Sequence, residues 1–227
     1  MNVAQRRPHP ASRRGQPARG LSSLTLTSVA LVLFSFAMTE QATPGPPPQP
    51  DSGQAFQPGQ TPSTPAGPTL PSATPTRLKI PTIGVNAPLT GLSLENGGRL
   101  AAPPEDERNL VGWYEDGITP GSRGTAIAAG HVDIPSGPAV FYNLGTLNKG
   151  MYIDIDRADH RTARFIIDAI EVYPTDTFPS TKVYADRHRA ELRLITCGGG
   201  YDTTHHRYRG NVVVYAHLTT QPTALPH

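Results

Sequence analysis

Short apolar runs separated by glycine- and proline-rich turns fill residues 77–218, a pattern typical of strands rather than long helices. Turn signals such as Asn96-Gly97-Gly98 and Pro120-Gly121 divide these runs. We expect strands at 77–80, 87–92, 125–130, 151–156, 163–173, 190–196 and 211–218, and short helical pieces around 105–114, 140–147 and 182–187. This arrangement predicts a mainly β domain, either a closed barrel or a sandwich.

The N-terminal part of the chain has a different composition. Five arginines fall within residues 1–20, and residues 21–38 carry no charge. As a helix, the uncharged stretch would span roughly 27 Å, close to the ~30 Å of a bilayer core. We therefore expect a basic cytoplasmic tail at 1–20 and a single-pass transmembrane signal anchor at 21–38 in the cell membrane. A cleaved signal peptide is the alternative, and both interpretations place the remaining residues outside the cytoplasm.

Residues 39–76 are rich in Pro, Gly, Ser, Thr, Gln and Ala. Such a segment buries too little apolar surface to offset its chain entropy, so we expect a disordered spacer. A folded domain at 77–219 and a short C-terminal tail at 220–227 would follow. The formal net charge is only +2, which gives little electrostatic support to a nucleic-acid partner.

Cys197 is the only cysteine, so no disulfide can form within the chain. Three glycines follow it directly and leave little side-chain cover beside the sulfur. On the strand before it, Leu192 and Leu194 share one face and look like core residues, which places Cys197 on the opposite, less buried face. These features favour a reactive thiol over a buried apolar filler.

A cysteine thiol with its ordinary pKa near ~8.5 is only slightly ionised at pH 7, so a reactive one needs an imidazole or a cation nearby. The chain has eight histidines. His131 directly follows the apolar strand expected at 125–130, so the sheet would position it while leaving it open to a cleft. His205 and His206, in the loop after Cys197, are further candidates. The alternative role for His131 is to cap a turn.

Arg209 lies just before the last expected strand, 211–218. If this strand pairs antiparallel with 190–196, Arg209 could reach the Cys197 face. A guanidinium there would favour the thiolate or hold the oxyanion of a tetrahedral intermediate. The alternatives are an exposed cation on an edge strand, or the same role for Arg207.

Four segments together resemble the sequence signatures of sortases. Leu194-Ile195-Thr196-Cys197 resembles the Leu-x-Thr-Cys signature, and Arg209 matches the arginine at the start of the following strand. Gly130-His131-Val132-Asp133 is similar to the histidine motif, and Leu78-Lys79-Ile80-Pro81-Thr82-Ile83 resembles the first-strand Ile-Pro-x-Ile signature. The resemblance covers residues 77–218 in the expected order, and is closest to the class E/F sortases of actinobacterial type.

This resemblance implies an eight-stranded sortase barrel and a transpeptidation that needs no cofactor or metal. Cys197 would attack the Thr–Gly carbonyl of an LPxTG-like sorting signal and form a thioacyl enzyme. His131 would carry the proton, Arg209 would stabilise the oxyanion, and Thr196 would contribute to substrate or oxyanion binding. The implied partners are sorting-signal proteins and a cell-wall precursor amine.

Three other functions remain open at this point. The chain could be an L,D-transpeptidase or a cysteine peptidase of the cell wall, although Thr196-Cys197-Gly198 lacks the histidine that the former places before its cysteine. It could also be a non-catalytic, wall-associated β-domain with an inert Cys197. A metalloenzyme built on His131, Asp133, His205 and His206 is a weaker option.

Overall fold

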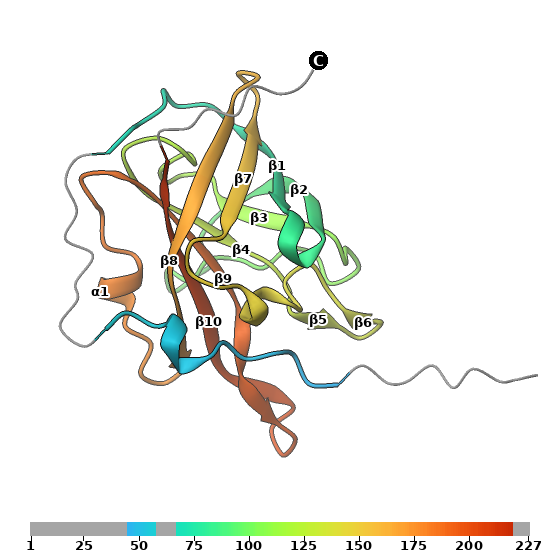
Figure 1. The fold of residues 1–227 in the computed structure, drawn as a ribbon. Helices are drawn as coiled ribbons and strands as arrows, with labels where there is room; N and C mark the ends of the chain where they lie inside the picture. The colour runs from blue at the N-terminus through green and yellow to red at the C-terminus, as the bar shows by residue number, and fades with distance from the viewer. Residues whose placement is uncertain (1–44, 58–66, 220–227) are drawn as a thin grey trace, which may run out of the picture. The chain divides into compact units, whose positions relative to one another are not determined.

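Alternation between buried and less buried side chains shows which face of each strand meets the core. In β7 (Tyr152–Arg157) every second residue is buried, and the same alternation runs through most of β8 (Thr162–Pro174). The computed structural model describes residues 45–57 and 67–219. Among them, eight strands form a closed barrel in the order β1-β2-β3-β4-β9-β10-β8-β7 (Figure 1). Of the two predicted architectures, the closed barrel is therefore confirmed.

The other barrel strands are β1 (Pro75–Ile80), β2 (Val85–Leu92), β3 (Val111–Tyr114), β4 (Gly124–Ala129), β9 (Ala190–Asp202) and β10 (Arg207–Leu218). A separate two-stranded sheet contains β5 (Asp133–Ile134) and β6 (Gly137–Pro138). The helical pieces are η1 (Ser52–Gln54), η2 (Pro81–Ile83), η3 (Leu144–Thr146) and α1 (Ser180–Val183). Strands β2 and β3 pair parallel, as do β4 and β9.

The interior of the barrel is filled by aliphatic and aromatic side chains from nearly every strand. Phe165, Leu192, Leu194 and Val214 are all 0% exposed. Burial of each such side chain contributes about 2 kcal/mol relative to its exposure. Because Leu192 and Leu194 face inward, the neighbouring residues of β9 face outward, as the sequence predicted.

The prediction of a helical segment around 105–114 is wrong. Residues 111–114 form β3, which pairs parallel with β2 and antiparallel with β4. Val111 and Trp113 are buried, two residues apart, as they must be on one face of a strand. The barrel needs a strand between β2 and β4, and this tertiary requirement overrides the local pattern. The other two helical pieces are present only as the single short turns η3 and α1.

The prediction that this strand ends at residue 196 is also wrong, because β9 continues to Asp202 and forms a long hairpin with β10. In this hairpin Cys197 pairs with Asn211 and Gly198 pairs with Gly210. Gly199 and Gly200 have φ angles of 73° and 87°, a region that glycine enters at little cost. The glycine run thus bends the strand without ending its pairing.

Part of the expected disordered spacer is described and lies against the barrel (Figure 1). The backbone N–H of Gly199 donates a 2.9 Å hydrogen bond to Gln49 Oε1, and that of Lys149 donates a 2.8 Å bond to Gln54 Oε1. The Phe56 and Tyr215 rings pack edge to face with centroids 5.1 Å apart. Residues 45–57 are therefore an ordered strap, and the expectation of a free spacer is wrong for them.

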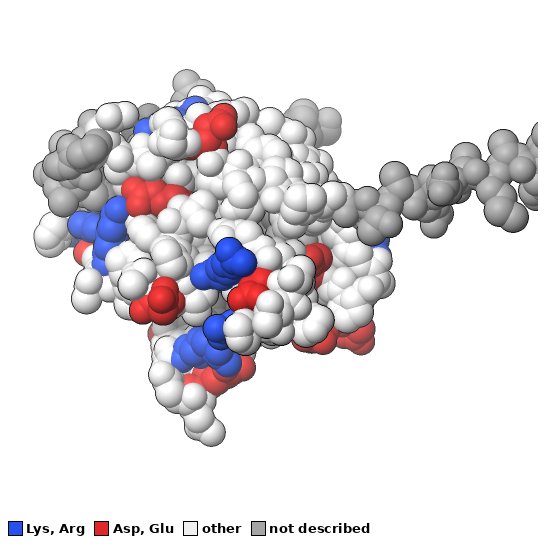
Figure 2. Space-filling view, turned by 90° about the horizontal axis from the view of Figure 1, so that it is seen from below, with Lys and Arg blue, Asp and Glu red and all other residues white. Residues whose placement is uncertain are grey.

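The expected membrane anchor at 21–38 lies outside the described residues. No helix in the described ranges, 45–57 and 67–219, is long and apolar enough to cross a membrane. Figure 2 shows basic and acidic side chains interspersed on the face seen from below, with neither sign forming a continuous patch.

Candidate active site

The parallel pairing of β4 with β9 brings His131 and Cys197 to the same edge of the barrel. Ala129 is the register partner of Ile195, and each strand then advances two residues, one to His131 and the other to Cys197. Parallel strands run in the same direction, so their carboxyl ends meet. His131 and Cys197, which are 66 positions apart in sequence, therefore lie at the same edge of the sheet.

Hydrogen bonds join the two segments up to the residues that directly precede His131 and Cys197. The N–H of Gly130 donates to the carbonyl oxygen of Ile195 at 3.2 Å, and the Thr196 hydroxyl donates to the carbonyl oxygen of Gly130 at 2.8 Å. Thr196 is only 4% exposed. Its hydroxyl is therefore engaged inside the protein, where it holds the segment that precedes His131.

Cys197 lies on the outer face of β9, and its side chain is exposed. The pKa of its thiol is nevertheless raised above the ordinary value. The protein around the sulfur desolvates the thiolate, and the Asp133 carboxylate adds a repelling negative charge. In the free protein this environment favours the protonated thiol.

The His131 ring is held by a backbone contact. Its Nε2 lies 2.7 Å from the carbonyl oxygen of Pro103. A carbonyl only accepts hydrogen bonds, so Nε2 carries the proton and Nδ1 is the basic nitrogen in this arrangement. The ring is half-buried and the Pro103 residue that holds it is buried, which fixes its orientation while leaving it accessible.

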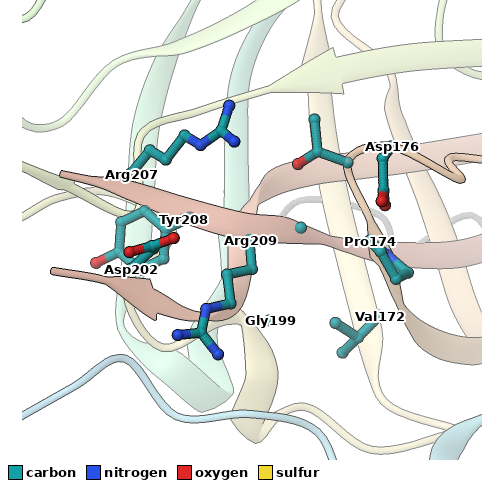
Figure 3. Close-up of a pocket in the computed structure, with 10 residues that line it drawn as sticks. Val172, Pro174, Asp176, Gly199, Asp202, Arg207, Tyr208 and Arg209 are labelled. Carbon is teal, nitrogen blue, oxygen red and sulfur yellow. The ribbon is translucent and has the colours of Figure 1, made fainter. Parts of the chain in front are cut away.

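Arg209 is placed by an irregularity in the hairpin. The register of β10 against β9 shifts between Tyr208 and Gly210, so Arg209 lies at a bulge. In Figure 3 the guanidinium groups of Arg207 and Arg209 point away from each other, although the two residues lie two apart on one strand. The side chains of these two arginines therefore leave the strand in different directions, which strand parity alone did not predict.

Arg209 lines a pocket of about 590 Å³ between the hairpin and the end of β8 (Figure 3). The walls include Asp176 and Asp202 as well as both arginines. The pKa of Asp202 lies below its ordinary value, chiefly because Asp202 is hydrogen-bonded to His205, and the Arg209 charge contributes. Arg209 thus lies in a pocket of mixed charge two residues before Asn211, the partner of Cys197.

Two residues beside Cys197 were missed as site residues by sequence reasoning. The Tyr208 hydroxyl donates a hydrogen bond to Oδ2 of Asp133, and the pKa of Tyr208 is raised, first by desolvation and then by this bond, with Cys197 contributing. Asp133 belongs to the Gly-His-Val-Asp segment, so its position two residues after His131 could have indicated a site residue. No sequence pattern indicated Tyr208 as a site residue, because it was expected in a loop.

A second, mainly apolar cavity of about 340 Å³ lies over the outer face of β4. Thr125 and Ile127 line it, together with Tyr184 from the connection between β8 and β9. These two β4 residues share the outer face with Ala129, since side chains alternate along a strand. The outer face of β4 therefore extends from this cavity towards His131.

The metal site considered for His131, Asp133, His205 and His206 is not formed. His205 instead binds Asp202, with Nδ1 2.9 Å from Oδ2. Within residues 45–57 and 67–219, no group of three or more His, Cys, Asp or Glu side chains could hold a metal ion.

Comparisons with known proteins agree on one family. The Sortase domain family matches residues 78–219 of this chain. Sortase A from Corynebacterium diphtheriae is 20% identical, covering 68% of this chain and 65% of its own, with a TM-score of 0.51. Its lid mutant gives the same identity and TM-score over 66% and 72%. Sortase C1 of GBS Pilus Island 1 is 18% identical over 67% of each chain, with a TM-score of 0.51. At such identities these structures show likeness of fold, and the curated proteins give no match.

Proposed function

This chain belongs to the sortase family, and from that premise we propose that it cleaves an LPxTG-like sorting signal and joins the released acyl group to a cell-wall amine. The observation that carries the proposal is the parallel pairing of β4 with β9, because His131 and Cys197 each follow its last register pair by two residues. A nucleophilic thiol and an acid–base imidazole on neighbouring segments are what acyl transfer requires.

The acylation step uses the three residues in distinct roles. Nδ1 of His131 takes the proton of the Cys197 thiol, the resulting thiolate attacks the carbonyl carbon of the Thr–Gly bond, and the carbonyl oxygen becomes an oxyanion. Arg209 supplies a positive charge to that oxygen. As the carbon–nitrogen bond breaks, His131 donates a proton to the departing glycine amine, and a thioester remains on the sulfur.

The second step reverses the proton transfer. An amino group of the wall precursor attacks the thioester carbonyl, and His131 takes the proton released by that nitrogen. The thiolate then leaves and recovers this proton from His131. A new amide bond has then replaced the Thr–Gly bond. No oxidant, reductant or metal takes part in either step.

The apolar cavity over β4 supports an assignment for the first residue of the signal. Ile127 lies four residues before His131, which corresponds to about 13 Å of strand. An extended peptide spans that distance in about four residues, so the leucine of a Leu-Pro-x-Thr segment would reach the cavity lined by Ile127 and Tyr184. The assignment of this chain to class E or F rests on the sequence resemblance alone.

Attachment to the membrane is a further part of the proposal. The uncharged stretch at 21–38, preceded by five arginines, supports a retained anchor that leaves the barrel outside the cytoplasm. Fractionation of cells expressing the full chain tests this point. Recovery of the full-length protein in the soluble fraction would contradict a retained anchor.

The transpeptidase itself is tested with the full chain in detergent. A peptide carrying Leu-Pro-x-Thr-Gly should give a thioacyl adduct by intact mass, and Cys197→Ala should abolish it. His131→Ala and Arg209→Ala should reduce turnover at least ~100-fold. Arg207→Ala is the matched control, because its guanidinium points away from that of Arg209. The proposal fails if no adduct forms with any of a panel of sorting peptides.

A further inference from the structure

One hydrogen bond joins the segments that carry His131 and Arg209. Asp133 follows His131 by two residues, and Tyr208 directly precedes Arg209. The Tyr208 hydroxyl donates to Oδ2 of Asp133 across 75 positions of sequence. Cys197 is near enough to this bond for the Asp133 carboxylate to raise the pKa of its thiol, and for Cys197 in turn to raise the pKa of Tyr208.

Each partner is held in place from its own side. Asp133 is in β5 and pairs with Pro138 of β6, so its backbone is part of a small sheet. The Tyr208 ring packs against that of Tyr201 across the hairpin, with centroids 5.1 Å apart and planes at 71°. Both partners are half-buried, so the bond is partly shielded from water and joins two supported segments.

We propose that Asp133 and Tyr208 are paired positioning residues, which fix the spacing of His131 and Arg209 around Cys197. The inference rests on the proposed function, since it assigns these residues a task in that reaction. Neither residue needs to touch the scissile bond. The pair acts by preventing the segment after His131 from moving relative to the start of β10.

The charged and titratable groups around the sulfur give the pair a second effect. Asp133 approaches from β5 and Tyr208 from β10, with Tyr142 from the segment before η3 acting on Tyr208. The Arg209 charge acts on Asp202. Asp133 therefore opposes ionisation of Cys197, and the Tyr208 bond keeps its carboxylate at the position where it does so.

The experiment compares Asp133→Asn, Tyr208→Phe and the double variant in the full chain. Both substitutions keep the side-chain shape and remove the charge or the donor. The first readout is the pH dependence of Cys197 alkylation by iodoacetamide, which requires no sorting peptide. Asp133→Asn should move the alkylation midpoint to lower pH by about half a unit to one unit.

The second readout is kcat/KM with the sorting peptide. Each single variant should lose about 10-fold, because Asp133→Asn replaces the charged acceptor by a neutral amide and Tyr208→Phe removes the donor. The double variant should lose no more than the worse single variant, because both substitutions act on the same hydrogen bond. Tyr201→Phe is the matched control, since its ring remains against Tyr208, and it should leave both readouts unchanged. The melting temperature of each variant checks that the fold is kept.

An unchanged alkylation midpoint in Asp133→Asn would overturn the proposal. So would a loss of kcat/KM in the double variant that equals the product of the two single losses. If no peptide is turned over, the proposed function fails, and the alkylation midpoint still decides whether Asp133 governs the thiol. If Asp133→Asn alone fails to fold, Tyr208→Phe, which retains the ring contact with Tyr201, still tests the proposal. An unchanged kcat/KM in that variant would overturn it.

Discussion

The Thr196 hydroxyl donates a 2.8 Å hydrogen bond to the carbonyl oxygen of Gly130, which joins the residue before Cys197 to the residue before His131. Both residues are buried, so the bond is protected from competition with water. It continues the pairing of β4 with β9 beyond the last residue of β4. The distance between Cys197 and His131 therefore depends on a side chain that faces the interior.

Replacement of Thr196 by valine tests this dependence. Thr196→Val keeps the shape and leaves the buried Gly130 carbonyl without this donor, which should cost about 1–3 kcal/mol of unfolding free energy. We expect kcat/KM to fall about 10-fold, while Thr196→Ser, which keeps the hydroxyl, stays close to the parent. Equal activity of the valine and serine variants would show that the bond does not position His131.

The thiol of Cys197 should react slowly at neutral pH. Its pKa is raised by desolvation and by the Asp133 charge, so the thiolate fraction rises only as the pH approaches that raised value. The alkylation rate of the full chain should therefore increase with pH, through a midpoint above the ~8.5 of an unperturbed cysteine. Iodoacetamide labelling followed by intact mass measures it, with glutathione as reference. A midpoint below that of glutathione contradicts the prediction.

A buried ion pair supports the outer face of β9. Arg193 is 0% exposed and Glu191 2% exposed, and the Arg193 guanidinium lies 4.4 Å from the centre of the Tyr215 ring. Arg193→Met should lower the free energy of unfolding by about 3 kcal/mol, because Glu191 then keeps only Arg189 as its partner. Urea unfolding followed by circular dichroism measures this loss.

The more exposed pair of Arg164 with Asp154 serves as the control for that measurement. Its charged atoms are 2.7 Å apart, yet Arg164→Met should cost less than about 1 kcal/mol, since solvent screens a surface pair. Similar losses in Arg193→Met and Arg164→Met would mean that burial does not distinguish the two pairs.

The strap formed by residues 45–57 should contribute to stability through Phe56. Its ring packs against Tyr215, and its N–H donates to Glu171 Oε1 at 3.2 Å. Phe56→Ala should lower the free energy of unfolding by about 1 kcal/mol and speed amide hydrogen exchange at Gly199, where Gln49 is bound. Asp51→Ala, at an exposed position of the strap, should change neither quantity. Unchanged exchange at Gly199 in the Phe56 variant would show that the strap is not held as one unit.

Tyr184 should affect substrate binding more than the chemical step. It lines the apolar cavity over β4 and is 48% exposed, so Tyr184→Ala is compatible with folding. We expect KM for a Leu-Pro-x-Thr-Gly peptide to rise about 10-fold with kcat nearly unchanged, as for loss of an apolar contact. A peptide with alanine in place of leucine should show a smaller change. Equal effects on both peptides would place the leucine elsewhere.

The sequence by itself determined most of the strands and the outward face of Cys197. Leu192 and Leu194 alternate with their neighbours on β9, and an alternating pattern specifies inside and outside without reference to the rest of the fold. His131 also stood out from the sequence, because an apolar strand ran directly into it. These features are local, so neighbouring residues were enough to predict them.

The tertiary structure decided the features that depend on pairing between distant segments. Residues 111–114 became β3 because β2 and β4 each needed a partner there. The strand of Cys197 continued past its glycines because β10 supplied hydrogen-bond partners for it. The Asp133–Tyr208 bond and the docking of residues 45–57 likewise join segments far apart in the chain. Local propensity carries no information about such partners, because the free energy of these contacts exists only once the barrel has closed.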